Sequence, residues 1–157
     1  MLLYFFGDYM KEYFMTEALK EAKKAFDKNE IPVGCVIVCD NKIIARAHNL
    51  RENKKNALYH AEIIAINKAC KKLKSWRLDN CDMYVTLEPC SMCSGAIIQS
   101  KIKNIYFGAS DLKTGAAGGK LDLFSFKFNY DPNVEGAILE EECSKIIKDF
   151  FVKLREK

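Results

Sequence analysis

Two short segments of the sequence carry residue types that bind zinc. The motif H-A-E begins at His60, and the motif P-C-S-M-C contains Cys90 and Cys93. One imidazole and two thiolates from a C-x-x-C turn suit a tetrahedral zinc site whose fourth position is left for water. A structural zinc takes four protein ligands, whereas a catalytic zinc takes three and keeps a water. The spacing therefore predicts a catalytic zinc site at His60, Cys90 and Cys93.

Glu62 meets the second requirement of such chemistry, a group that moves protons. Zinc lowers the pKa of bound water from 15.7 to about 7, so hydroxide becomes available near neutral pH. A carboxylate beside the site can take the water proton and pass it to a ring nitrogen and then to a leaving amine. The combined pattern H-x-E…P-C-x-x-C is the signature of zinc nucleobase deaminases. Hydrolytic deamination, with Glu62 as proton carrier, is therefore the predicted reaction class.

Other interpretations of these residues stay open. Taken alone, His60 could be a core or surface histidine, and C-x-x-C could be a redox pair or half a structural zinc knuckle. A structural site would need a fourth protein ligand, for which Cys35 and Cys39 are candidates. Four residues apart on a strand, these two share a face with Ile37 and are typical of small buried hydrophobic side chains.

The composition predicts one globular domain. The chain has 157 residues, of which 49% are hydrophobic and 29% charged, with a net charge of +4. These values exclude a disordered or fibrous protein, and no apolar stretch approaches the ~20 residues of a membrane span. The seven cysteines are odd in number and follow no secretory leader. We therefore expect thiols or metal ligands in a reducing compartment, and a cytoplasmic protein with no membrane partner.

Residues 1–9 are predicted to be an N-terminal extension and residues 10–157 a single deaminase domain. The run from Met1 to Phe6 is apolar, but it is shorter than a signal-peptide core and no basic residues precede it. Met10 directly precedes the first clear helical pattern. Two interpretations of residues 1–9 stay open. They could be a disordered extension, or the true start of the protein could lie downstream of Met1.

Hydrophobic periodicity predicts the elements that position the two motifs. Helices are expected over residues 13–26, 60–74, 89–99 and 143–154. Strands are expected over residues 33–39, 43–47, 83–87 and 104–107, the first two as a hairpin, with a last short strand before the final helix. This order predicts a three-layer α/β/α domain with a mixed central sheet of about five strands. In such sheets the chemistry lies beyond the carboxyl ends of the strands.

At these motifs the sequence resembles the cytidine deaminase-like superfamily, and within it the bacterial-type tRNA-specific adenosine deaminases. The resemblance extends from about Lys11 to the C-terminus and includes T-L-E-P-C before the second cysteine and D-L-K-T-G-A-A-G from Asp111. The second block is the more diagnostic, because many cytosine, cytidine and guanine deaminases share the zinc motif and lack it. The resemblance implies hydrolytic deamination of the wobble adenosine of a tRNA anticodon, typically that of an arginine tRNA, to inosine.

The resemblance also implies a role for individual residues. It gives the zinc ligands and Glu62 the roles derived above, with one Zn²⁺ and its bound water in each subunit. Asn49 would read the flipped-out adenine, and Asp111 and Lys113 would belong to a loop near the anticodon. On the residues alone, Asn49 could instead cap a loop, Asp111 a turn, and Lys113 could simply be solvated. Family members are usually homodimers that bind the tRNA anticodon stem-loop across both subunits.

Two positions depart from the family pattern and leave the details of anticodon contact open. Tyr59 stands where a small residue often precedes the zinc histidine, and Tyr130 stands where the family commonly has histidine. The nearest alternative function is deamination of a free base or nucleoside, guanine foremost. A non-catalytic zinc-containing RNA-binding module is the alternative from another class, and Glu62 argues against it. The glycine-rich stretch 115–120 fails the P-loop pattern and is predicted to be a flexible substrate loop.

Overall fold

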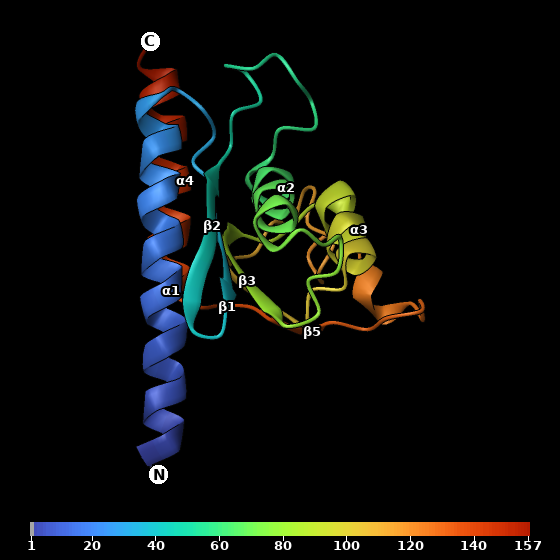
Figure 1. The fold of residues 1–157 in the computed structure, drawn as a ribbon. Helices are drawn as coiled ribbons and strands as arrows, with labels where there is room; N and C mark the ends of the chain where they lie inside the picture. Colours follow the sequence, from blue (N-terminus) through green and yellow to red (C-terminus); the bar gives the residue numbers. More distant parts are fainter. Residues whose placement is uncertain (1) are drawn as a thin grey trace.

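The computed structural model of the chain describes residues 2–157 and has the predicted alternation of helices and strands (Figure 1). The helices are α1 (Leu2–Asp27), α2 (Ala61–Leu73), α3 (Ser91–Ser100) and α4 (Glu140–Arg155), with a short 3₁₀ turn at Leu123–Ser125. The strands are β1 (Gly34–Cys39), β2 (Lys42–His48), β3 (Cys81–Leu87), β4 (Asn104–Ala109) and β5 (Asn133–Glu135).

The strands form one mixed sheet in the order β2-β1-β3-β4-β5. The hairpin strand β2 pairs antiparallel with β1, and β1 pairs antiparallel with β3. The pairs β3–β4 and β4–β5 are parallel. The predicted five-stranded mixed sheet is confirmed, and the carboxyl ends of β3 and β4 lie side by side at one edge.

Helices cover both faces of the sheet, which confirms the three-layer α/β/α architecture. Figure 1 shows α1 and α4 on one face and α2 and α3 on the other. Alternate residues of β1 enter the two cores: Cys35 and Ile37 pack beneath α2 and α3, whereas Val36 and Val38 pack with Phe14 of α1. This alternation is the pattern of a strand buried on both sides.

The contact between α1 and β1 is unusually close at Gly34. A Cβ atom there would overlap backbone atoms of Ala18 and Ala22 in α1. Only glycine therefore allows the helix to lie this near the strand. The tight packing fixes β1 and the chain that leads into it from Ile31.

The helix boundaries differ from the prediction by one to three residues, apart from the start of α1. Helix α1 begins at Leu2, before the predicted start at residue 13, and Met1 lies outside the described residues. The side chains from Leu2 to Phe6 are largely exposed, so this turn of helix leaves no burial pattern in the sequence. Helix α3 begins at Ser91 because Cys90 has extended backbone geometry and is its N-cap. The division at residue 9 stays a prediction.

No helix within residues 2–157 has both the length and the apolarity needed to span a membrane.

Candidate active site

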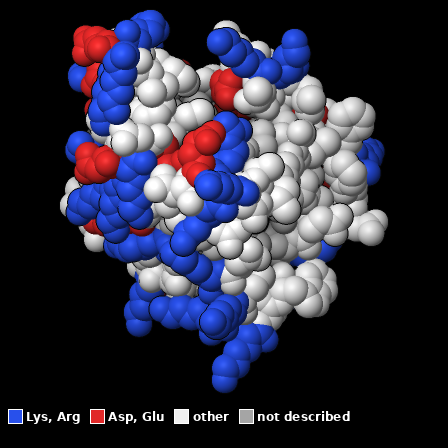
Figure 2. All heavy atoms as spheres, turned by 90° about the horizontal axis from the view of Figure 1, so that it is seen from above, with Lys and Arg blue, Asp and Glu red and all other residues white. Residues whose placement is uncertain are grey.

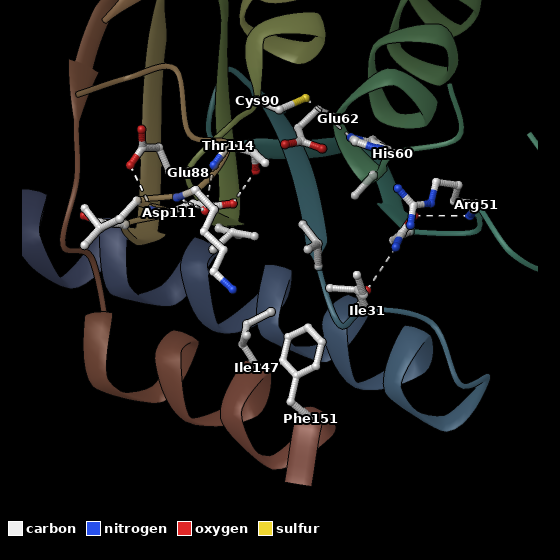
Figure 3. Close-up of a pocket in the computed structure, with 17 residues that line it drawn as sticks. Ile31, Arg51, His60, Glu62, Glu88, Cys90, Asp111, Thr114, Ile147 and Phe151 are labelled. Carbon is white, nitrogen blue, oxygen red and sulfur yellow. Dashed lines mark hydrogen bonds between the residues drawn. The ribbon is translucent and has the colours of Figure 1, made fainter. Parts of the chain in front are cut away.

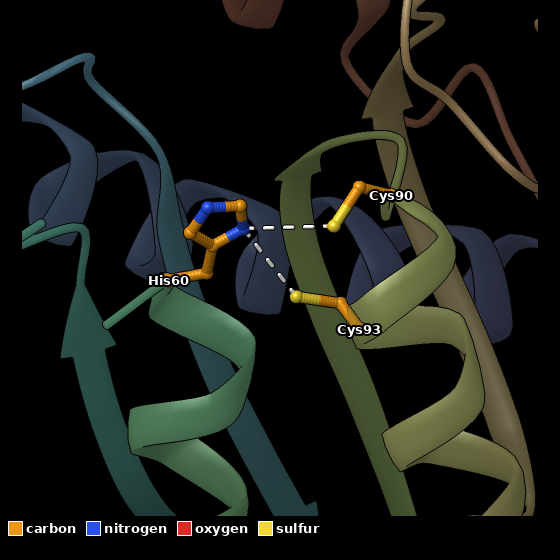
Figure 4. A group of neighbouring side chains, drawn as sticks. All are labelled: His60, Cys90 and Cys93. Atoms are coloured by element: carbon orange, nitrogen blue, oxygen red, sulfur yellow. Dashed lines mark hydrogen bonds between the residues drawn. The ribbon is translucent and has the colours of Figure 1, made fainter. Parts of the chain in front are cut away.

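The three predicted metal ligands come together at the N-termini of two helices (Figure 4). His60 is the N-cap of α2 and Cys90 is the N-cap of α3, and both have extended backbone geometry. Cys93 lies in the first turn of α3, at the position whose side chain faces the N-cap residue. Because His60 is outside the helical spiral, it and Glu62 can face the same point although they are only two residues apart.

The spacing of the donor atoms fits a tetrahedral metal site. The Nδ1 atom of His60 lies 3.6 Å from the Sγ atom of Cys90 and 3.6 Å from that of Cys93. All three ligand atoms lie within 4.8 Å of one another. Zinc bonds to sulfur at about 2.3 Å and to nitrogen at about 2.0–2.1 Å, which puts such ligand pairs about 3.6 Å apart in a tetrahedron. The group can therefore bind a metal ion, and its donor set suits Zn²⁺.

Hydrogen bonds among the ligand side chains shift their pKa values in opposite directions. The hydrogen bond from Cys93 lowers the pKa of Cys90 to about 4, against the opposing effect of burial. The same hydrogen bond, together with burial, raises the pKa of Cys93. A hydrogen bond with Cys90 raises the pKa of His60. Cys90 is thus the ready thiolate, and a bound metal would release the proton that Cys93 holds.

Glu62 is the buried acid beside this cluster. Its side chain is 4% exposed and points into the pocket between Cys90 and His60 (Figure 3). Burial raises its pKa to about 7. A carboxyl group that titrates near neutral pH is well suited to take up and return a proton. The structure thus places Glu62 where a proton carrier would work.

The cluster forms the end of a pocket of about 540 Å³ that opens beyond the carboxyl ends of β3 and β4 (Figure 3). The loop after β2 forms one wall, and the loop that begins at Ser110 after β4 forms another. Ile147 and Phe151 of α4 close a third side. Ile31 and Val33 add apolar surface. The volume lies in the range of small-molecule sites and the walls suit the flat face of a purine.

Asn49 lies in this pocket, 8% exposed, with its amide oriented by the protein. Its Nδ2 group donates to the carbonyl of Ile31 at 3.2 Å, and its Oδ1 atom accepts from the backbone N–H of Arg51 at 3.2 Å. An amide has two N–H donors and two acceptor lone pairs, so one of each is left. Asn49 therefore caps its loop and still offers a donor and an acceptor to a ligand.

Asp111 and Lys113 both line the pocket, as the resemblance implied. The Asp111 carboxylate accepts hydrogen bonds from the backbone N–H groups of Lys113 at 2.9 Å and Thr114 at 3.1 Å, and from the Thr114 hydroxyl at 2.7 Å. Burial would raise the pKa of Asp111, but the hydrogen bonds from Thr114 and Lys113 lower it. Asp111 is therefore both a turn cap and a fixed negative charge at the pocket wall.

The structure also shows what the sequence did not predict. Phe151 lies in the predicted last helix; it is 40% exposed and lines the pocket, while its neighbour Phe150 is buried. Two adjacent aromatic residues on one helix are the signal that one of them faces elsewhere. Arg51 lines the pocket as well. Tyr130 is not among the lining residues, and Lys101 lies over its ring.

The glycine-rich stretch 115–120, predicted to be flexible, is held by hydrogen bonds. The N–H of Lys120 donates to the carbonyl of Gly115 at 2.9 Å, and the N–H of Gly118 donates to that of Leu121 at 2.9 Å. The carboxylate of Glu88 accepts from two further N–H groups of this stretch. The structure thus gives this stretch a defined hydrogen-bonded conformation, which a local glycine count could not predict because the Glu88 partner lies elsewhere in the chain.

Several known proteins resemble this chain. The family of MafB19-like deaminases matches residues 10–155. The chain is 48% identical over 147 residues to the tRNA-specific adenosine deaminase of Bacillus subtilis (strain 168), covering 93% of this chain and 91% of the relative.

Two solved structures are informative. One comes from a study of A-to-I editing by tRNA:A34 deaminases at the wobble position, with a TM-score of 0.83, 40% identity, and coverage of 85% of this chain and 98% of that one. The other is a guanine deaminase from Bacillus subtilis, with a TM-score of 0.62, 37% identity, and coverage of 73% of each chain.

Proposed function

Since the chain belongs to the family of tRNA-specific adenosine deaminases, we propose that it hydrolyses an adenosine of tRNA to inosine and ammonia. The observation that carries the proposal is the position of Glu62 beside the His60, Cys90 and Cys93 cluster, at the end of a pocket of purine size. A non-catalytic zinc-binding module would have no use for a buried carboxylate in that place.

The proposed reaction needs residues that hold the metal and a residue that transfers protons. His60, Cys90 and Cys93 would hold Zn²⁺, which would lower the pKa of a water in the site. Glu62 would take a proton from the attacking water and deliver it to N1 of the purine as the C6–O bond forms. A second proton transfer through Glu62 goes to the amino group, and the C6–N bond breaks to release ammonia. The net reaction exchanges the 6-amino group for oxygen and consumes one water.

Asn49 is proposed to hold the base. Asn49 lines the same pocket as His60, Glu62 and Cys90, and its amide keeps one N–H donor and one acceptor lone pair beyond its two bonds to the protein. An amide so fixed can pair with the edge of a flipped-out adenine without first losing rotamer freedom. The apolar side chains of Val33 and Ile147 offer surfaces for the purine face.

The substrate is proposed to be a tRNA and not a free base. Arg51, Asp111 and Lys113 stand on the pocket walls, where they can meet the ribose, phosphates and neighbouring bases of a loop nucleotide. Lys and Arg side chains gather in a band on the end of the molecule shown in Figure 2. An anticodon base is single-stranded, so flipping it into the pocket costs little.

Finer features rest on the family resemblance of the sequence. We propose the wobble adenosine of an arginine tRNA as the target, a homodimer as the active assembly and the cytoplasm as its place. Exposed apolar side chains, among them Trp76, Leu112 and Phe126, offer surface for a second subunit. Light scattering of the zinc-loaded protein tests the dimer directly.

A comparison of two substrates tests the proposed function. The zinc-loaded protein is incubated with an anticodon stem-loop carrying a wobble adenosine and, separately, with guanine. We expect inosine in the RNA and no ammonia from guanine. Ammonia from guanine without inosine in RNA would instead establish the activity named for the Bacillus subtilis structure.

A further inference from the structure

Two walls of the pocket are loops whose backbone N–H groups bind buried carboxylates. Neither carboxylate belongs to the His60, Cys90 and Cys93 group. Glu88, 3% exposed, lies beneath the loop after β4, and Glu30, fully buried, lies beneath the loop after β2. Neither residue has a part in the proposed proton transfers. A buried carboxylate is costly unless hydrogen bonds satisfy it, so the partners of each indicate its function.

The Glu88 carboxylate accepts only backbone N–H groups of the loop after β4. Oε1 accepts from Asp111 at 3.0 Å, and Oε2 accepts from Ala117 at 2.9 Å and from Gly119 at 2.8 Å. The backbone N–H of Glu88 donates to the carbonyl of Ala109 at 2.8 Å. One side chain therefore ties the beginning and the end of this loop to the segment that leads into α3.

The loop is shaped to fit around this carboxylate. A Cβ atom on Gly119 would lie 2.7 Å from Oε1 and 2.8 Å from Oε2 of Glu88, and one on Gly115 would overlap the same group. Both glycines thus let the backbone approach the acid closely. The loop cannot move away without leaving a buried carboxylate without its donors.

We propose that Glu88 is a positioning residue that fixes the 111–119 loop as a preformed wall of the pocket and thereby sets the affinity for the RNA substrate. The statement about RNA rests on the proposed function, and the statement about the loop does not. The segment between the tied ends carries Asp111, Lys113 and Thr114, all on the pocket wall. A preformed wall spares the ordering cost that a mobile loop would have on binding.

Glu30 provides a matched comparison on the other wall. Its Oε1 atom accepts from the backbone N–H groups of Glu52 at 2.7 Å and Asn53 at 3.3 Å. These partners belong to the loop that carries Asn49 and Arg51. The two acids share burial and the kind of partner but hold different loops, so their substitutions should be separable.

The first test is hydrogen exchange of backbone amides in the zinc-loaded protein. Glutamine has one acceptor oxygen and a donor NH₂, so Glu88→Gln cannot satisfy all three N–H groups. We expect the amides of Asp111, Ala117 and Gly119 to exchange at least tenfold faster, and those of Glu52 and Asn53 to be unchanged. Glu30→Gln should give the reverse pattern. Protection of the 111–119 amides equal to the parent in Glu88→Gln would overturn the proposal.

The second test is steady-state kinetics on an anticodon stem-loop. Glu88→Gln should raise KM about tenfold or more while kcat changes less and zinc content stays at the parent level. Asp82→Asn is the stability control, because Asp82 accepts a hydrogen bond from Asn104 at 2.7 Å at the other end of β3. That control should leave KM unchanged. A fall in kcat at unchanged KM would contradict the positioning role.

A variant from the loop side keeps the test decisive if Glu88→Gln does not fold. A methyl group at Gly119 would overlap both the backbone carbonyl of Asp111 and the intact Glu88 carboxylate. Gly119→Ala must therefore move the loop off the acid, and it should give the same faster exchange and higher KM. Parent-like exchange and KM in Gly119→Ala would then overturn the proposal. If the parent protein does not act on RNA, faster exchange in the variants still supports the loop contact and only the proposed function fails.

Discussion

The Nδ1 atom of His60 lies 3.6 Å from the Sγ atom of Cys93, although the two residues begin different helices on the same face of the sheet. The separation matches two ligands of one zinc ion. The helices α2 and α3 lie side by side with their N-termini together at the ligands (Figure 4).

Removing a ligand should remove the metal. In Cys93→Ser we expect zinc, measured by atomic emission on the purified protein, to fall below about a tenth of the parent value, because a buried serine hydroxyl is a poor zinc ligand. Cys70→Ser is the control, since Cys70 is a cysteine outside the cluster. Retention of one zinc per chain in Cys93→Ser would show that the metal lies elsewhere.

Replacing the proton carrier should stop the chemistry and spare the site. Glu62→Gln keeps the size of the side chain but cannot accept the proton, so we expect kcat to fall by about 10²–10⁴-fold. Zinc content and affinity for the anticodon stem-loop, measured by anisotropy, should match the parent. Loss of zinc from Glu62→Gln would mean that Glu62 is a ligand and not a carrier.

These two predictions depend on residues that the sequence identified. The residue types and spacing of His60, Glu62, Cys90 and Cys93 are enough to predict a zinc site and a proton carrier. The first two residues lie at the N-terminus of α2 and the last two at the N-terminus of α3, so each pair is close in the sequence. The alternation of apolar residues likewise predicted the sheet and its layers.

Other features depend on contacts between distant segments, which a local pattern does not contain. Glu88 appeared only as a letter of the T-L-E-P-C motif, and its loop partners lie more than twenty residues away. Phe151 lines the pocket because α4 packs on the sheet at β4, a contact between distant segments. The early start of α1 left no signal because its exposed side chains pack on nothing that sets a period.

Asn49 should contribute to substrate affinity beyond its part in the loop. Asn49→Ala removes the donor and acceptor proposed to meet the base, and we expect kcat/KM on the stem-loop to fall about 10- to 100-fold. Asn56→Ala is the matched control: Asn56 accepts from the backbone N–H of Leu58 at 2.9 Å in the same loop and is not a pocket residue. An equal loss of kcat/KM in both variants would mean that Asn49 acts only as a loop cap and does not bind the base.

Stability should decline in acid partly through Glu17. Hydrogen bonds from Lys20 at 2.9 Å and Arg46 at 2.8 Å lower the pKa of this carboxyl below its usual 4.5. A lowered folded-state pKa gives stability that is present above the unfolded value and is lost as pH falls through the folded value.

Urea unfolding of Glu17→Gln and the parent checks this. The free energy of unfolding of the variant should be lower at about pH 7, and the two proteins should converge as the pH falls through the lowered folded-state pKa of Glu17. A difference that stays the same as the pH falls would assign the loss to packing and not to charge.

The most direct test of the central claim is deamination of RNA in H₂¹⁸O. The zinc-loaded protein is mixed with a stem-loop carrying a wobble adenosine, and the digested nucleosides are analysed by mass spectrometry. Hydrolysis at C6 predicts inosine with one ¹⁸O atom, one ammonia for each inosine, and neither product with Glu62→Gln. Adenosine that remains unconverted with the parent protein, or inosine formed equally by Glu62→Gln, would contradict the account.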